Sequence, residues 1–223
     1  MSGNHNQTQK KLFHNYHSLD LQNKVYQQKA LSLAIKVSKN KKSIQLVELG
    51  CADKSFLNLV CKKIKAKGQG MDISLGDDFE KPLKLKNNSL DLLIALEVIE
   101  HLYDTDHFLQ EINRSLKSKG YLIISTPNLA SLGNRFKLLF GGYPKYLEFS
   151  REGAGHIHLY TPNVLINQLK QSGFKIKLFT SPNFFCPFIT KPWFPPILRQ
   201  FFMFLGDLFP TTGSHLLVLA QKP

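Results

Sequence analysis

The residues around the first predicted strand could hold a nucleoside. Residues 48–53 read Glu-Leu-Gly-Cys-Ala-Asp, and Gly50 closes an alternating apolar segment. A glycine at such a point lets the backbone turn sharply and approach a ligand closely. Asp72 follows 22 positions later, where a second short strand is expected to end. A carboxylate at that separation can accept hydrogen bonds from both hydroxyl groups of a ribose. The pattern predicts a nucleoside-type ligand, and a tight turn with a solvated aspartate is the alternative.

Two widespread nucleotide-binding motifs are missing from the sequence. No GxxxxGK[ST] segment occurs, so the turn is not a phosphate-binding loop of that kind. No GxGxxG segment occurs either, which disfavours a nicotinamide-dependent enzyme.

The elements that would position this turn alternate between strand and helix. Strands are predicted over residues 44–49, 68–73, 90–96, 121–125, 174–180 and 215–220. Helices are predicted over residues 19–37, 55–65, 104–116 and 162–173. The continuous apolar run LDLLIAL is typical of a strand buried on both faces. We therefore expect an α/β fold with a doubly wound, mostly parallel sheet and helices on both faces.

The domain organisation follows from the same pass along the chain. Residues 1–43 are interpreted as an N-terminal helical extension, and residues 44–223 as one domain. Residues 127–160 and 181–213 do not fit the alternation and are interpreted as inserts. In an open α/β sheet the ligand lies beyond the carboxyl ends of the strands, where inserts commonly form the substrate wall.

Several segments, in the right order, resemble motifs of the class I S-adenosylmethionine-dependent methyltransferases. They are VELGCADKSFL, GMDIS, GDDFEKPLKLKNNSLDLLIALEVIEHL, FLQEINRSLKSKGYLIISTPN and GHIHLYTPNVLINQLKQSGF. The resemblance covers residues 44–179 and is to the small-molecule branch that includes the ubiquinone-biosynthesis O-methyltransferases. It implies a seven-stranded sheet and S-adenosyl-L-methionine as the cofactor.

The resemblance also assigns cofactor contacts to Glu48, Gly50, Cys51, Asp72, Ile73, Asp78, Phe79, Leu96 and Glu97. Asp72 would bind the ribose, and Ile73 would pack on the adenine. Asp78 would contact the adenine amino group, with Phe79 stacking nearby. The other residues would surround the methionine end and the sulfonium.

The chain departs from the family in the first turn. The family usually has GxGxG there, whereas this chain has Gly50, Ala52 and Lys54 at the three positions. Alanine adds a methyl group where the backbone approaches the cofactor, and lysine adds bulk and positive charge near a cationic sulfonium. A degenerate, non-catalytic cofactor-binding scaffold is therefore kept as an alternative.

Methyl transfer to a hydroxyl group needs a base, and histidine is the side chain best suited to that role near neutral pH. The candidates for catalytic residues are His101, His156 and His158. Glu97, Glu100 and His101 stand at i, i+3 and i+4, which on a helix could bind a divalent ion, but no metal is predicted. Asn128, just after the strand predicted over residues 121–125, could position an acceptor or form a turn.

The composition of the chain indicates its cellular location and the class of partner that it could bind. The chain has 29 basic and 16 acidic residues, a net charge of +13, which favours an anionic partner. Only four of the basic residues are arginines, and the segment after the strand predicted over residues 121–125 reads TPN rather than [DN]PP[YF], so nucleic acid is disfavoured. Three cysteines without a CxxC spacing, and no secretory leader, predict a cytoplasmic protein.

Nine aromatic residues crowd residues 184–209. This segment could form a lid on the core, an apolar acceptor pocket, a dimer face, or a peripheral contact with the inner membrane surface. Arg199 and Asp207 interrupt it, so it would lie on a membrane at most.

The sequence therefore predicts a methyltransferase that acts at oxygen on a small-molecule, sugar or lipid-linked acceptor. The scaffold described above is the first alternative. An RNA-binding methyltransferase, favoured only by the charge, is the second.

Overall fold

The computed structural model describes residues 25–41, 43–145, 155–184, 186, 188–189, 191 and 193–223. The start of the helix that the sequence predicts from Leu19 lies outside these residues. The six strands are β1 (Gln45–Leu49), β2 (Lys67–Met71), β3 (Leu90–Leu96), β4 (Leu116–Pro127), β5 (Lys175–Thr180) and β6 (His215–Gln221). The α-helices are α2 (Val25–Ser38), α3 (Ser55–Ile64), α4 (Thr105–Ser115), α5 (Leu132–Leu139), α6 (Pro162–Gln171) and α7 (Pro196–Leu208).

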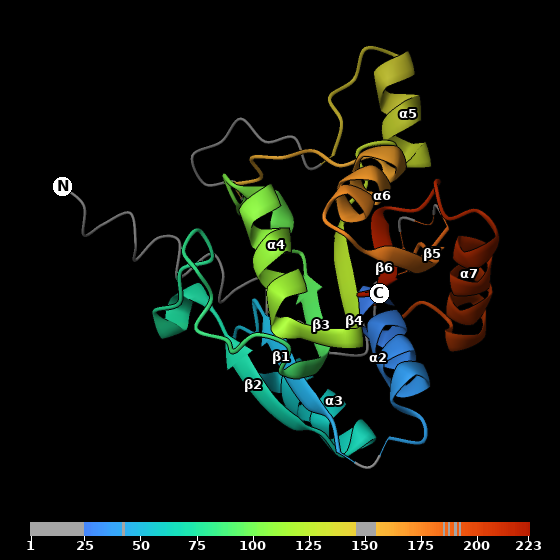
Figure 1. The fold of residues 1–223 in the computed structure, drawn as a ribbon. Helices are drawn as coiled ribbons and strands as arrows, with labels where there is room; N and C mark the ends of the chain where they lie inside the picture. Colours follow the sequence, from blue (N-terminus) through green and yellow to red (C-terminus); the bar gives the residue numbers. More distant parts are fainter. Residues whose placement is uncertain are drawn as a thin grey trace.

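The strands form one sheet in the order β2-β1-β3-β4-β6-β5 (Figure 1). β1 to β4 run parallel to one another, whereas β6 lies antiparallel between β4 and β5. The predicted doubly wound α/β class is confirmed.

The sheet has six strands in the described part of the chain, so the expected number of seven is wrong. β2 is an edge strand, because residues 72–89, which lead to β3, form no strand. Side chains of α4 hold this segment instead. The Leu83 N–H donates to the Glu111 carboxylate at 2.8 Å, and the Arg114 guanidinium donates to the carbonyls of Leu83 and Leu85. These bonds satisfy backbone groups that would otherwise pair with a neighbouring strand.

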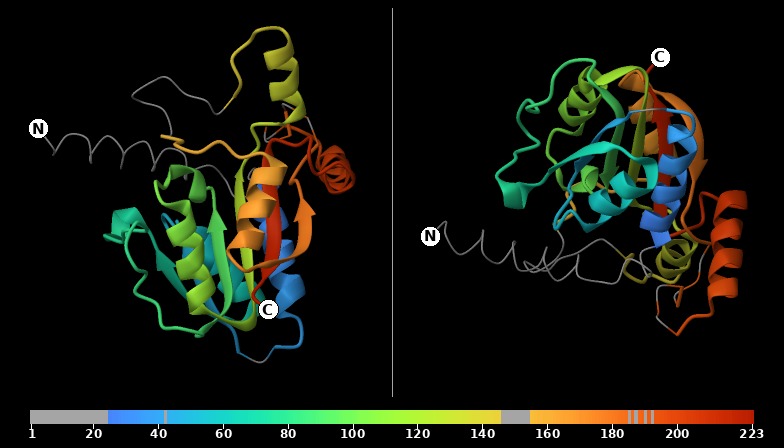
Figure 2. Two further views of the ribbon diagram at one scale, coloured as in Figure 1. Left: turned by 45° about the horizontal axis from the view of Figure 1, so that its top comes forward. Right: turned by 90° about the horizontal axis from the view of Figure 1, so that it is seen from below.

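Helices cover both faces of the sheet (Figure 2). α4 and α6 bury Phe108, Ile112 and Leu165 on one face. α2 and α3 bury their apolar residues on the other face, against β1 and β3. α2 belongs to this second core layer, because Ala30, Leu33 and Ala34 are almost completely buried in it.

The carboxyl ends of β1, β3 and β4 meet at one edge of the sheet, as parallel strands require. The antiparallel β6 brings its first residue to the same edge, because His215 pairs with Pro127 at the end of β4. Residues far apart in the sequence therefore meet beyond these strand ends.

Candidate functional site

The turn after β1 has a left-handed backbone at three alternate positions. Gly50, Ala52 and Lys54 have φ angles of 77°, 45° and 62°. A side chain at Gly50 would place its Cβ 2.5 Å from Cγ2 of Val98, so this position needs glycine for space as well as for conformation. The alanine and lysine thus change the residue types of the expected GxGxG turn but keep its left-handed backbone. The left-handed backbone lowers the stability of the fold by ~1–2 kcal/mol for each residue other than glycine that adopts it.

This strain makes a prediction for Ala52. Replacing Ala52 by glycine relieves the left-handed strain but adds chain entropy to the unfolded state, so we expect Tm to rise by about 1–3 °C. The control is Ala34→Gly in the middle of α2, which lowers Tm because glycine weakens a helix interior. Thermal unfolding of the two variants beside the wild type checks this. A fall in Tm for both would contradict a strained turn.

Asp72 joins the ends of β1 and β2. Its Oδ2 accepts the Ala52 N–H at 2.9 Å, and its Oδ1 accepts the Ser74 N–H at 2.8 Å. Asp72 is 7% exposed, and its bond to Ala52 holds the carboxylate against the first turn rather than in bulk solvent. Because a carboxylate oxygen has two lone-pair sites, each oxygen keeps one for a further donor.

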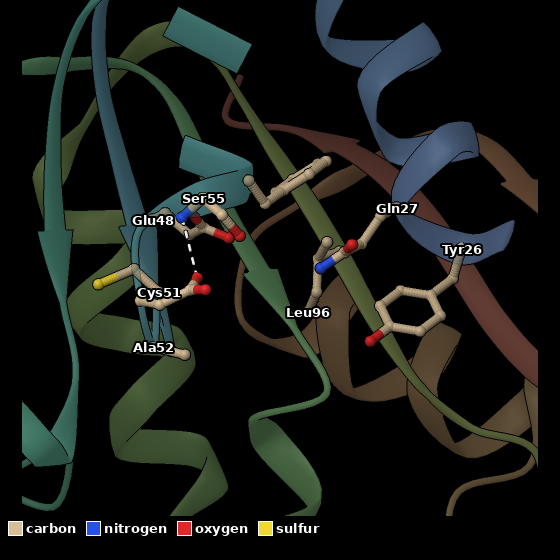
Figure 3. A pocket seen from close by; sticks show the side chains of 10 residues that line it. Tyr26, Gln27, Glu48, Cys51, Ala52, Ser55 and Leu96 are labelled. Atoms are coloured by element: carbon tan, nitrogen blue, oxygen red, sulfur yellow. Dashed lines mark hydrogen bonds between the residues drawn. The ribbon is translucent and has the colours of Figure 1, made fainter. Parts of the chain in front are cut away.

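A cavity lies between this turn and α2 (Figure 3). It has a volume of about 20 Å³ and is lined by Tyr26, Gln27, Glu48, Gly50, Cys51, Ala52, Asp53, Ser55, Phe56 and Leu96. In Figure 3 the side chain of Gln27 reaches from α2 toward Leu96 and the β1 turn. Gln27 is buried, and its Oε1 atom has no hydrogen-bond partner among the described residues. Lys54 is not among the lining residues, so it does not plug the cavity.

The cavity is lined by a carboxylate, which suits a cationic ligand group, and by a thiol that is not reactive. Glu48 is buried, lines the same cavity as Gln27 and contributes a carboxylate. Burial and the negative charges of Glu48 and Asp72 raise the pKa of the Cys51 thiol to about 12, so Cys51 stays protonated and is a poor nucleophile. A ligand larger than a water molecule requires the side chains of α2 to move, since the cavity admits little more than one.

The residues after β2 are divided between the surface and the core. Ile73 is 60% exposed next to the buried Asp72, which leaves an apolar surface where the resemblance places the adenine. Asp78 pairs with Lys81 at 2.9 Å, and the hydrogen bond from Lys81 is the main cause that lowers the Asp78 pKa. Phe79 is buried against Phe108, with ring centroids 5.9 Å apart, so it supports this loop from the core side.

Glu97 meets a histidine that the sequence analysis did not single out. Glu97 Oε1 accepts a hydrogen bond from Ser125 Oγ at 2.6 Å, and its Oε2 lies 3.4 Å from His215 Nε2. The His215 ring also stacks on Tyr26 at 5.4 Å, which connects it to the cavity wall. Burial, followed by the charges of Lys145 and His156, lowers the His215 pKa to about 3. The only local signal was a polar residue at the start of an apolar strand.

Burial also raises the Glu97 pKa from 4.5 to about 7. A raised carboxyl pKa contributes stability that is fully present below pH 4.5 and is lost as pH rises through 7. We expect Glu97→Gln to avoid this loss, because a neutral amide can still accept the Ser125 bond. The unfolding free energy of the variant relative to the wild type should rise by ~3 kcal/mol between about pH 5 and about pH 8. Denaturant unfolding at both pH values measures this, and a difference independent of pH would contradict it.

Two of the three predicted histidines lie together. The rings of His101 and His156 are 4.8 Å apart, and His101 Nδ1 lies 3.4 Å from the Gly155 carbonyl. His158 turns elsewhere, with its Nε2 atom 3.3 Å from the Tyr103 carbonyl. The structure thus brings His101 and His156 into one cluster and leaves His158 beside it.

Glu100 underlies this cluster. Its carbonyl accepts the N–H groups of Ile157 and His158 at 2.8 and 3.0 Å, which fixes the histidine segment to the end of β3. Its carboxyl is 1% exposed, and burial together with the charge of Glu97 raises its pKa well above the ordinary value. The donor atoms of Glu100, His101 and His156 lie within 4.8 Å of one another, a grouping that could hold a metal ion.

Asn128 has a structural position. Its side-chain amide donates to the carbonyls of Thr211 and Gly213, and its Oδ1 accepts the Ala130 N–H. These bonds tie the end of β4 to the segment before β6, so the turn interpretation of Asn128 fits this geometry.

Comparisons with known proteins agree with this arrangement. A family model described as a methyltransferase domain matches residues 20–177, well over half of the chain. An uncharacterized protein of Methanocaldococcus jannaschii is 25% identical over 213 residues, covering 86% of this chain and 84% of that protein. The ubiquinone biosynthesis O-methyltransferase of Pelagibacter ubique is 25% identical over 162 residues, covering 64% of this chain and 66% of that protein. This chain therefore spans just under two thirds of the length of that enzyme.

Among solved structures, a SAM-dependent methyltransferase from Thermotoga maritima superposes with a TM-score of 0.59. The match covers 97% of this chain and 99% of that chain at 16% sequence identity, which shows a shared fold.

Proposed function

Because this chain belongs to the class I S-adenosylmethionine-dependent methyltransferases, we propose that it methylates an oxygen atom of a small-molecule, sugar or lipid-linked acceptor. The cofactor is S-adenosylmethionine, which supplies a methyl group on a positively charged sulfonium. The acceptor and the atom that is methylated are the new parts of this proposal.

The residues of the cavity fit this cofactor. Gln27 Oε1 and the Glu48 carboxylate are buried acceptors, which suit the ammonium group at the methionine end. Asp72 would accept the ribose hydroxyls through its remaining lone pairs, and the exposed face of Ile73 would pack on the adenine. Leu96 and Glu97 would border the sulfonium from the end of β3, where a carboxyl group can balance its charge.

The observation that carries methylation at oxygen is the pairing of His101 and His156. A hydroxyl group must lose its proton as the methyl group arrives, and an imidazole can take that proton near neutral pH. The buried Glu100 carboxyl has an oxygen within 4.8 Å of a nitrogen of each ring, where hydrogen bonds from it would orient the two rings. An acceptor placed over these rings would face the end of β3, which borders the cofactor cavity.

The test is to identify the atom that receives the methyl group. The protein is incubated with S-adenosylmethionine that carries a ¹³C-labelled methyl group and with extracts fractionated into polar metabolites, sugars and lipids. The product is then examined by ¹³C NMR, in which methoxy carbons are separated from N-methyl and C-methyl carbons. A methoxy signal supports the proposal, and a signal only from N-methyl or C-methyl carbons overturns it.

The scaffold alternative makes a different prediction. A degenerate scaffold, whose altered first turn holds the cofactor only weakly, would show no micromolar binding of S-adenosylmethionine or of its demethylated product in calorimetry. The left-handed backbone at Ala52 and Lys54 and the position of Lys54 outside the cavity lining favour binding. The same titration therefore separates the two functions without an identified acceptor.

A further inference from the structure

α7 presents an apolar stripe that nothing in the described residues covers. Ile197, Phe201, Phe204 and Leu208 stand at i, i+4, i+7 and i+11, which is one face of a helix, and they are 77%, 53%, 56% and 56% exposed. In both figures of the fold α7 stands at the margin of the molecule beside the edge strand β5 (Figures 1 and 2). A large apolar face at such a place commonly marks an interaction surface.

The opposite face of α7 is fixed to the protein. Phe202 and Met203 pack against a small core formed by Val25, Ile189 and Phe194. Gly206 lies so close to the backbone that a Cβ there would be 2.5 Å from the Ser181 carbonyl oxygen. The exposed stripe is therefore held outward by packing on the other side of the helix.

Two exposed aromatic residues precede α7 in the sequence. Phe188 and Trp193 have ring centroids 5.7 Å apart and are more than half exposed. Arg199 holds their loop in place, because its guanidinium donates to the carbonyls of Ile189, Lys191 and Phe194. We call Phe188, Trp193, Ile197, Phe201, Phe204 and Leu208 together the α7 surface.

The charged residues in the C-terminal part of the chain are almost all basic. Residues 162–223 contain a single acidic residue, Asp207, and six basic residues: Lys170, Lys175, Lys177, Lys191, Arg199 and Lys222. Asp207 is ion-paired with Lys29 and accepts a hydrogen bond from the Thr180 hydroxyl, so its charge is balanced locally. Lys175 and Lys177 are exposed on β5, the strand that contacts α7, and Lys191 is exposed and lies between the two aromatic residues in the sequence.

From these observations we infer that the α7 surface docks the protein on an anionic lipid bilayer, with α7 lying in the plane of the interface. Aromatic and aliphatic side chains enter the headgroup region, while neighbouring lysines are attracted by anionic lipids. A tryptophan at the end of such a stripe suits the interface, because its ring is amphipathic. Among the described helices, none combines the length and the apolar character of a bilayer-spanning segment.

The inference does not depend on the methyl acceptor, but it is compatible with a lipid-linked one. The segment that follows α7 leads directly to the site edge of the sheet, because the Thr212 carbonyl accepts the Leu132 N–H beside α5 and the Asn128 amide donates to Thr211. Docking through α7 would therefore bring the bilayer close to the carboxyl ends of the strands.

The test uses the full chain and sedimentation with vesicles of phosphatidylcholine, with or without phosphatidylglycerol. The wild type should bind the anionic vesicles and bind the neutral ones at least about tenfold more weakly. The double variant Phe201→Gln/Phe204→Gln should lose at least about tenfold in binding to anionic vesicles. Both replaced side chains are more than half exposed, so Tm and the circular dichroism spectrum should stay unchanged.

The matched control is Tyr103→Gln/Val164→Gln, which removes two exposed apolar side chains on the α4 and α6 side of the sheet. It should bind vesicles within about twofold of the wild type. No binding by the wild type, or full binding by the α7 variant through other apolar residues or lysines alone, overturns the inference. A wild-type dimer in light scattering that dissociates in the α7 variant would identify the surface as a protein interface and overturn it as well.

Discussion

Replacing His101 or His156 by glutamine is expected to lower kcat by about 10²–10⁴-fold for whichever residue takes the acceptor proton. Glutamine keeps the size and a hydrogen-bonding group but cannot take up a proton near neutral pH. The dissociation constant for S-adenosylmethionine should stay within about twofold of the wild-type value, because neither ring lines the cofactor cavity. Initial rates with the acceptor that the labelling experiment identifies measure kcat, and calorimetry measures cofactor binding.

The matched control for this prediction is His107→Gln. His107 lies in the first turn of α4, where its N–H group bonds to the Asp104 carboxylate, so this histidine is outside the cluster. A kcat within about twofold of the wild type is expected for it. If His101→Gln and His156→Gln behave like this control, the proton is removed by another group, and the role proposed for the pair is wrong.

Replacing Asp72 by asparagine is expected to weaken S-adenosylmethionine binding by about 10–100-fold, since charge-assisted hydrogen bonds to the ribose are replaced by weaker ones. The amide can accept from only one side, so either the Ala52 or the Ser74 N–H loses its partner as well. Calorimetry with the cofactor, at a temperature where circular dichroism shows the variant to be folded, measures the effect.

Asp91 offers a close control at the opposite end of the sheet. Its carboxylate also accepts a backbone N–H, that of Gln45 at 2.9 Å, and pairs with Lys117. Asp91→Asn should therefore cost stability as Asp72→Asn does, but leave cofactor binding within about twofold. Equal losses of binding in the two variants would show that Asp72 acts through stability alone.

The parts of the site that lie on parallel strands were predictable from the sequence. Strand ends in a parallel sheet meet at one edge, so the order of the elements alone places Gly50, Asp72 and Leu96 near one another. The apolar run of β3 and the proline at the start of α6 also predicted those elements correctly. These signals are local, and the rules of parallel-sheet topology then predict which strand ends lie together.

The positions of His215 and Gln27 and the number of strands depend on contacts between distant parts of the chain, which the local sequence pattern does not encode. His215 reaches the site because β6 is antiparallel to β4, and a strand pattern does not state its direction. Gln27 enters the cavity from α2, which resembled an appended helix in the sequence. No strand forms over the described residues 72–89, because Arg114 and Glu111 bind the backbone of that segment. In the sequence, Glu111 and Arg114 look like an ordinary ion pair on a helix, and nothing indicates that they bind backbone groups of another segment.

The most direct test of the site is a crystal structure of the protein with the demethylated cofactor, S-adenosylhomocysteine. We predict both ribose hydroxyls within hydrogen-bond distance of the Asp72 carboxylate, the adenine against Ile73, and the amino group beside Gln27 and Glu48. A ligand bound elsewhere, with the Asp72 carboxylate still bonded only to the Ala52 and Ser74 N–H groups, would contradict this site.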